Sequence, residues 1–66
     1  MPAIKVIELI GVSTKSWEDA AASALSHATK TVRNITGIDV TSQTAKVKDG
    51  KIVEFHAACN LAFKVD

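Results

Sequence analysis

The chain has 66 residues, of which 47% are hydrophobic and 23% charged, and its formal net charge is +1. This length allows a single domain over residues 1–66, which would hide only about 60% of the surface of its unfolded chain. A single cysteine excludes an internal disulfide, and the two histidines are too far apart in the sequence for a zinc-binding motif. The balanced charge excludes a basic surface that would bind nucleic acid or an anionic membrane. We therefore expect a cytoplasmic protein that is stabilised by assembly with copies of itself.

Residues 3–12 have the sequence pattern of a β-strand, in which successive side chains point to alternate faces. One face would carry Ile4, Val6, Glu8 and Ile10, and the other face is also largely apolar. So short a chain has too few other residues to cover both faces. The pattern therefore predicts that a partner subunit covers one of them.

A helix is predicted to follow, capped by Ser16 and running to about Arg33, with Gly37 just beyond its end. Asp19 lies three residues after Ser16, as in a capping box. The apolar residues at helical spacing are mostly alanine, which favours close packing on this chain's own sheet over a groove for a partner. They are Trp17, Ala20, Ala21, Ala24, Leu25, Ala28 and Val32.

Residues 38–48 and 51–65 predict two long strands joined by Asp49-Gly50, a pair that favours a type I′ hairpin turn. In the last strand the odd-numbered residues are apolar and would face the helix. The even-numbered face, with His56 and Asn60, would be left for subunit contacts or a shared ligand site. The β-α-β-β order predicts an α+β fold with an antiparallel sheet in the strand order 2-3-1.

The residue segments 5–13, 16–21, 31–34, 48–52 and 62–66 occur in an order and spacing that resemble the dodecin family. The resemblance covers nearly the whole chain. It implies a subunit whose three-stranded sheet half-wraps one helix, and a hollow homododecamer that stores a flavin (riboflavin, FMN or FAD) at its subunit interfaces. It also implies binding and storage in place of catalysis.

The same resemblance implies a stacking tryptophan and a glutamine as the flavin contacts. The tryptophan position falls on Gly37, which has no ring to stack, and the glutamine position falls on His56, which can stack or form a hydrogen bond. Asp39 lies two residues after Gly37 on the same strand face, where it could contact the polar tail of a ligand or a cation. The main flavin contact is therefore missing.

Carboxylates suggest an alternative function for the same shell. Glu8, Asp39 and Glu54 are candidates for a magnesium or calcium site if several subunits bring them together around an axis. Each is otherwise explained as a solvated surface charge. A dodecin-like shell without flavin would then be structural or would bind divalent cations.

A second alternative is an N-terminal-proline tautomerase. Removal of Met1 would expose Pro2 as a secondary amine, which such small enzymes use as a general base beside a cation such as Lys5 or Arg33. The hairpin and the helix start fit the dodecin pattern better. Cys59 is expected to be an inert buried thiol on the face opposite His56, so we expect no catalytic pair and no enzymatic activity.

Overall fold

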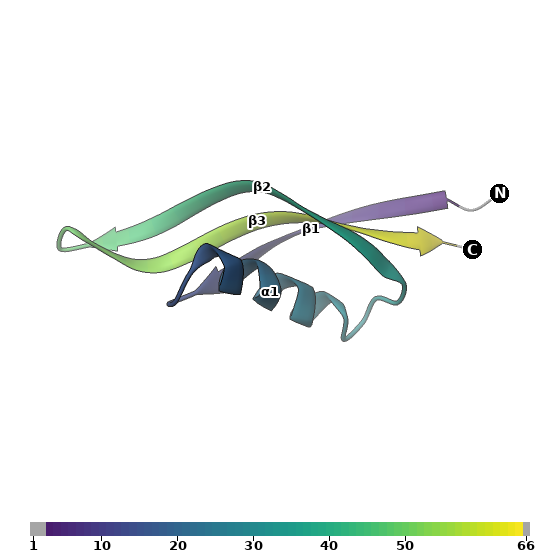
Figure 1. The fold of residues 1–66 in the computed structure, drawn as a ribbon, viewed down its shortest axis with the longest axis horizontal. Coiled ribbons are helices and arrows are strands. Elements are labelled where there is room, and N and C mark those ends of the chain that lie inside the picture. Colours follow the sequence, from purple (N-terminus) through teal and green to yellow (C-terminus); the bar gives the residue numbers. More distant parts are fainter. Residues whose placement is uncertain (1–2, 66) are drawn as a thin grey trace.

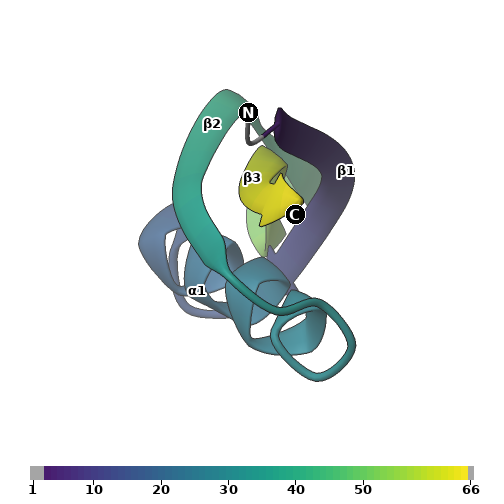
Figure 2. The ribbon, with the colours of Figure 1, turned by 90° about the vertical axis from the view of Figure 1, so that its right-hand side faces the viewer.

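The computed structural model describes residues 3–65. Its elements are β1 (Ala3–Ser13), α1 (Trp17–Ala28), β2 (Ile35–Lys48) and β3 (Lys51–Val65). The strands form one antiparallel sheet in the order β1-β3-β2, and this sheet curves over α1 (Figures 1 and 2). The structure confirms the predicted α+β fold, its β-α-β-β order and its strand order. No helix within residues 3–65 has both the length and the apolar composition that crossing a membrane requires.

The core lies between α1 and the odd-numbered residues of β3, as predicted. Ala57, Cys59 and Leu61 are fully buried, and Ala20 and Ala24 of α1 pack against the first two. Alanine on both sides lets the helix lie close to the strands. The remaining ends of β3 extend past this small core and are partly exposed.

Gly11 marks the closest approach between β1 and α1. A Cβ atom at this position would lie 1.8 Å from the carbonyl oxygen of Ala20 and 3.1 Å from the Cβ atom of Ala24. No side chain larger than hydrogen fits in this space. Gly11 therefore fixes the distance between the edge strand and the helix.

Hydrogen bonds define the start of α1 as the capping residues predict. The Ser16 hydroxyl accepts a hydrogen bond from the backbone N–H of Asp19 at 3.0 Å. The Trp17 indole N–H donates to the carbonyl oxygen of Thr44 at 2.8 Å, and its ring meets that of Phe55 edge-on with centroids 4.8 Å apart. Trp17 is thus a packing residue that joins α1 to the β2–β3 hairpin.

The helix ends at Ala28, so the prediction that it runs to Arg33 was wrong. The Thr29 hydroxyl donates to the carbonyl oxygen of Ser26 at 2.9 Å, and the following residues include β-branched threonine and valine, which disfavour helix. Asn34 then adopts a left-handed conformation, with φ of 64°, and β2 begins at Ile35 in place of the predicted residue 38. Gly37 therefore lies within β2 and does not stop the helix.

The register of the sheet differs between its two ladders. β1 pairs with β3 from Ala3 and Val65 onward without interruption. The β2–β3 ladder starts at a turn whose central residues, Asp49 and Gly50, have φ of 54° and 75°, as the predicted type I′ turn requires. This ladder contains three irregularities. Counted from the turn, the first leaves Val53 of β3 without a register partner and the second leaves Thr41 of β2 without one. Because the extra residues lie on opposite strands, the two register shifts cancel.

Candidate functional site

The residues predicted to bind a flavin or a metal lie on the outer face of the sheet, which we define as the side turned away from α1; they are Glu8, Gly37, Asp39, Glu54 and His56. This face carries the even-numbered residues of β3 and their partners on the two flanking strands. Directly paired residues of neighbouring strands project to the same side. The outer face can therefore be described as rows of three residues that run across β1, β3 and β2.

The central row is Glu8, Asn60 and Asp39. Asn60 of β3 is the register partner of both Glu8 on β1 and Asp39 on β2. Since neighbouring strands lie about 4.8 Å apart, the two carboxylate residues stand about 10 Å apart with the amide between them. Both carboxylates are exposed and Asn60 is half-buried. We call these three residues the oxygen row.

A hollow of about 340 Å³ borders the oxygen row. The smallest of its lining residues are Gly37 and Ala62, which are register partners, and the oxygen row contributes Asp39 and Asn60. A Cβ atom at Gly37 would meet only the Cβ atom of Ala62, at 3.8 Å. The glycine at the expected tryptophan position thus leaves open space on the outer face.

The two expected flavin contacts are far apart within one subunit. Gly37 pairs with Ala62, and Ala62 lies six residues along β3 from His56. Six residues of a strand span about 20 Å. A ligand much shorter than about 20 Å can therefore touch both positions only if they come from two subunits.

The three candidate metal-binding carboxylates fall into two groups. Glu8 and Asp39 share the oxygen row, whereas Glu54 lies six residues from Asn60 along β3, about 20 Å away. Within residues 3–65, no three or more His, Cys, Asp or Glu side chains come close enough to hold a metal ion. The oxygen row of one subunit is therefore an incomplete set of ligands.

Glu54 instead forms a pair with His56, a contact that the sequence analysis did not identify. The Nε2 atom of His56 lies 2.9 Å from Oε1 of Glu54, and the two side chains are 33% and 37% exposed. The hydrogen bond to His56, with a smaller contribution from the charge of Lys46, holds the pKa of Glu54 below its usual value. The signal for this pair was present in the sequence, because residues two apart on a strand share a face.

Asn60 is a candidate site residue that the sequence analysis placed on the uncovered face of β3 without identifying its partners. Counting equal steps outward from the two-residue turn pairs Asp39 with Asn60, and the structure shows this pairing. The partnership of Asn60 with Glu8 had no such signal, because β1 and β3 are not joined by a turn.

Cys59 is buried, and burial raises the pKa of its thiol, in agreement with the expected inert cysteine. Pro2, the proposed tautomerase base, lies outside the described residues.

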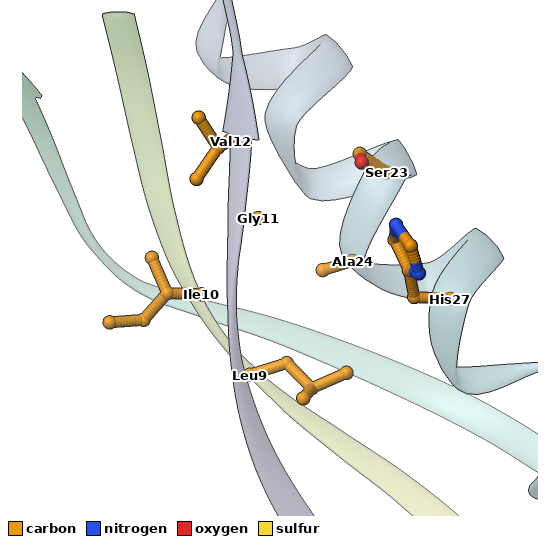
Figure 3. A pocket seen from close by; sticks show the side chains of 7 residues that line it. All are labelled: Leu9, Ile10, Gly11, Val12, Ser23, Ala24 and His27. Atoms are coloured by element: carbon orange, nitrogen blue, oxygen red, sulfur yellow. The ribbon is translucent and has the colours of Figure 1, made fainter.

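A second hollow, of about 430 Å³, lies between β1 and α1 (Figure 3). Leu9 and Ala24 point into this space, while Ile10 and Val12 point away from the helix, and His27 stands beside it on α1. The remaining lining residues are Gly11 and Ser23. Its lining contains no carboxylate and none of the predicted site residues, so the outer face remains the candidate site.

Comparisons with known proteins agree with this architecture. The model of the dodecin family matches residues 3–66. The calcium dodecin of Mycobacterium tuberculosis is 34% identical over 65 residues, which are 98% of this chain and 92% of that protein. A crystal structure of that calcium dodecin matches this chain with a TM-score of 0.84 and 37% sequence identity. The match covers 97% of this chain and 91% of that chain.

A dodecin from Streptomyces coelicolor shows the same fold at lower sequence identity. Its structure matches with a TM-score of 0.95 and 23% identity, covering 98% of this chain and 93% of that chain. Fold, family model and the calcium dodecin relative all give the same assignment. The chain therefore belongs to the dodecin family.

Proposed function

We propose that this chain is a non-enzymatic, cytoplasmic binding protein that closes into a homo-oligomer, about twelve subunits by family resemblance, and binds divalent cations on its outer sheet face. The observation that carries the proposal is the oxygen row, in which Glu8 and Asp39 flank Asn60. The relative from Mycobacterium tuberculosis is named a calcium dodecin and its crystal structure is described as having a novel calcium-binding site. These findings favour calcium over flavin as the bound species.

The chemistry of the oxygen row suits calcium. Calcium takes six to eight oxygen ligands from carboxylates, amide carbonyls and water. Two carboxylates and one amide carbonyl offer about five oxygen atoms at most, so water or a neighbouring subunit would supply the others. This need agrees with the incomplete ligand set of a single subunit.

A calcium titration by isothermal calorimetry tests the proposal. Wild-type protein should bind calcium, and Glu8→Gln and Asp39→Asn should each weaken the affinity about tenfold or more, because each removes one charged ligand. Glu54→Gln is the matched control, since Glu54 lies on the same face but about 20 Å from the oxygen row. Equal calcium affinities in wild type and both oxygen-row variants would contradict the proposal.

Flavin binding is the second candidate, favoured by the open space at Gly37. The nearest atom to a Cβ there is 3.8 Å away, and Gly37 is absent from the residues with positive φ, so a larger side chain fits without backbone strain. We expect Gly37→Trp to bind riboflavin at least tenfold more tightly than wild type, because an indole adds a stacking surface. Quenching of riboflavin fluorescence measures this. Unchanged emission with both proteins would remove flavin from the candidate ligands.

A further inference from the structure

The pair formed by Glu54 and His56 takes no part in the oxygen row, and its chemistry differs from that of the oxygen row. One potential metal ligand is the imidazole nitrogen Nε2 of His56 and the other is the carboxylate oxygen Oε1 of Glu54; the two atoms lie 2.9 Å apart. Both side chains are about two-thirds buried, although they lie on the outer face of the sheet. A half-buried nitrogen and oxygen pair is a ligand set for zinc and related transition metals, and calcium prefers oxygen alone.

The spacing of the two donor atoms is close to that of a tetrahedral metal site. Ligand atoms about 2.05 Å from a tetrahedral zinc ion lie about 3.3 Å from one another. The observed separation between Nε2 of His56 and Oε1 of Glu54 is 2.9 Å, about 0.4 Å shorter than this, so both side chains would have to turn away from each other and toward the ion to bind it. The backbone of β3 already places both donors on the same side of the strand, two residues apart.

One subunit supplies two ligands, whereas a closed zinc site needs four. No third His, Cys, Asp or Glu joins the pair within residues 3–65. On the β1 side, the surface beside the pair is apolar and uncovered. Val12, the partner of His56, is 46% exposed, and Ile10 in the adjacent row is 63% exposed. A second copy packed on this patch about a two-fold axis would place its own pair opposite the first.

We propose that His56 and Glu54 of two copies form a four-ligand site for zinc or a similar transition metal at a contact between subunits. The site is independent of the oxygen row and of calcium. Lys46 stands directly opposite Glu54 on β2, so its ammonium group opposes the charge of a bound cation. Lys46→Gln is therefore expected to raise the metal affinity several-fold.

Titration of the untagged, assembled protein with cobalt tests the site, because tetrahedral cobalt absorbs visible light and zinc displaces it. We expect one cobalt ion for every two chains, with at least a hundredfold loss of affinity in His56→Gln and in Glu54→Gln. His27→Gln, which removes the other histidine, and Glu8→Gln, which alters the oxygen row, should leave cobalt binding unchanged.

Three results would overturn the proposal. These are the absence of the tetrahedral absorption, a ratio of one cobalt per chain, and full binding by His56→Gln. Far-ultraviolet circular dichroism serves as the check on folding, since the His56→Gln spectrum should match that of wild type. Loss of cobalt binding with an unchanged spectrum supports the paired site, whatever the outcome of the calcium titration.

Discussion

Two glycines in this sheet have opposite surroundings, and this difference gives a prediction at the scale of single residues. We expect Gly11→Ala to lower the free energy of unfolding by about 3 kcal/mol or more, because its Cβ atom would lie 1.8 Å from a backbone oxygen and would push β1 off α1. Gly37→Ala is the control. Its Cβ atom would have no neighbour closer than 3.8 Å, so its effect should stay within about 1 kcal/mol. Urea denaturation measures both, and equal stability of Gly11→Ala and wild type would contradict the close approach at Gly11.

The sequence names candidate site residues one at a time and does not show how they group. Glu54 and His56 lie on the uncovered face that was expected for the even-numbered residues of β3, and the structure places Glu8 and Asp39 on the same face. Whether Glu8 stands beside Asp39 or beside Glu54 depends on the register of β1 against β3. That register pairs Gly11 of β1 with Ala57 of β3, residues that are far apart in the sequence, and no local pattern encodes such a pairing.

At the scale of elements, the sequence predicted what depends on neighbouring residues. The alternation in β3, the Asp49-Gly50 turn and the Ser16 cap were all confirmed. The end of α1 was not confirmed. The helix stops at Ala28, next to the hydrogen bond from the Thr29 hydroxyl to the Ser26 carbonyl oxygen, although apolar residues at helical spacing continue to Val32. Sequence periodicity does not show where such a side-chain hydrogen bond ends a helix.

The irregular register of β2 has a similar origin. Residues 41–44 are all polar, so this part of the strand has no apolar alternation to show which residues face α1. The bulge at Thr41 falls within this segment and reverses the odd and even faces of β2. The bulge at Val53 shifts the β2–β3 register by one residue, and the bulge at Thr41 shifts it back. Asp39 therefore pairs with Asn60, the partner that counting equal steps from the turn also gives.

The whole molecule is more extended than a compact chain of its length. Its Cα radius of gyration is 13.5 Å, whereas a compact chain of this length has about 11 Å. It exposes 4862 Å², and a compact protein of 7.0 kDa exposes about 4000 Å². Part of the excess exposed surface belongs to the β2–β3 hairpin, which extends beyond the end of β1 (Figure 1). Large apolar side chains of β1 add to it: Ile4, Val6, Ile10 and Val12.

Assembly is the expected consequence, and light scattering measures it. The wild-type protein should have about twelve times its monomer mass of 7.0 kDa, the number that the family resemblance implies. Ile10→Glu should shift the mass to smaller species, because it places a charge on the apolar outer face. Ser26→Glu, on an exposed position of α1, should assemble like wild type. A monomeric wild-type protein at neutral pH would contradict the assembly.

The unbroken ladder between β1 and β3 has a consequence for the chain's topology. Ala3 and Val65 are direct partners, so the first and last described residues lie side by side (Figure 1). A short turn between them would make β2, β3 and β1 one continuous meander followed by α1. In its present order the β1–β3 ladder joins opposite ends of the sequence, and such distant contacts slow folding. A circularly permuted chain that opens between α1 and β2 would turn that ladder into a local hairpin while leaving every strand with the same neighbours.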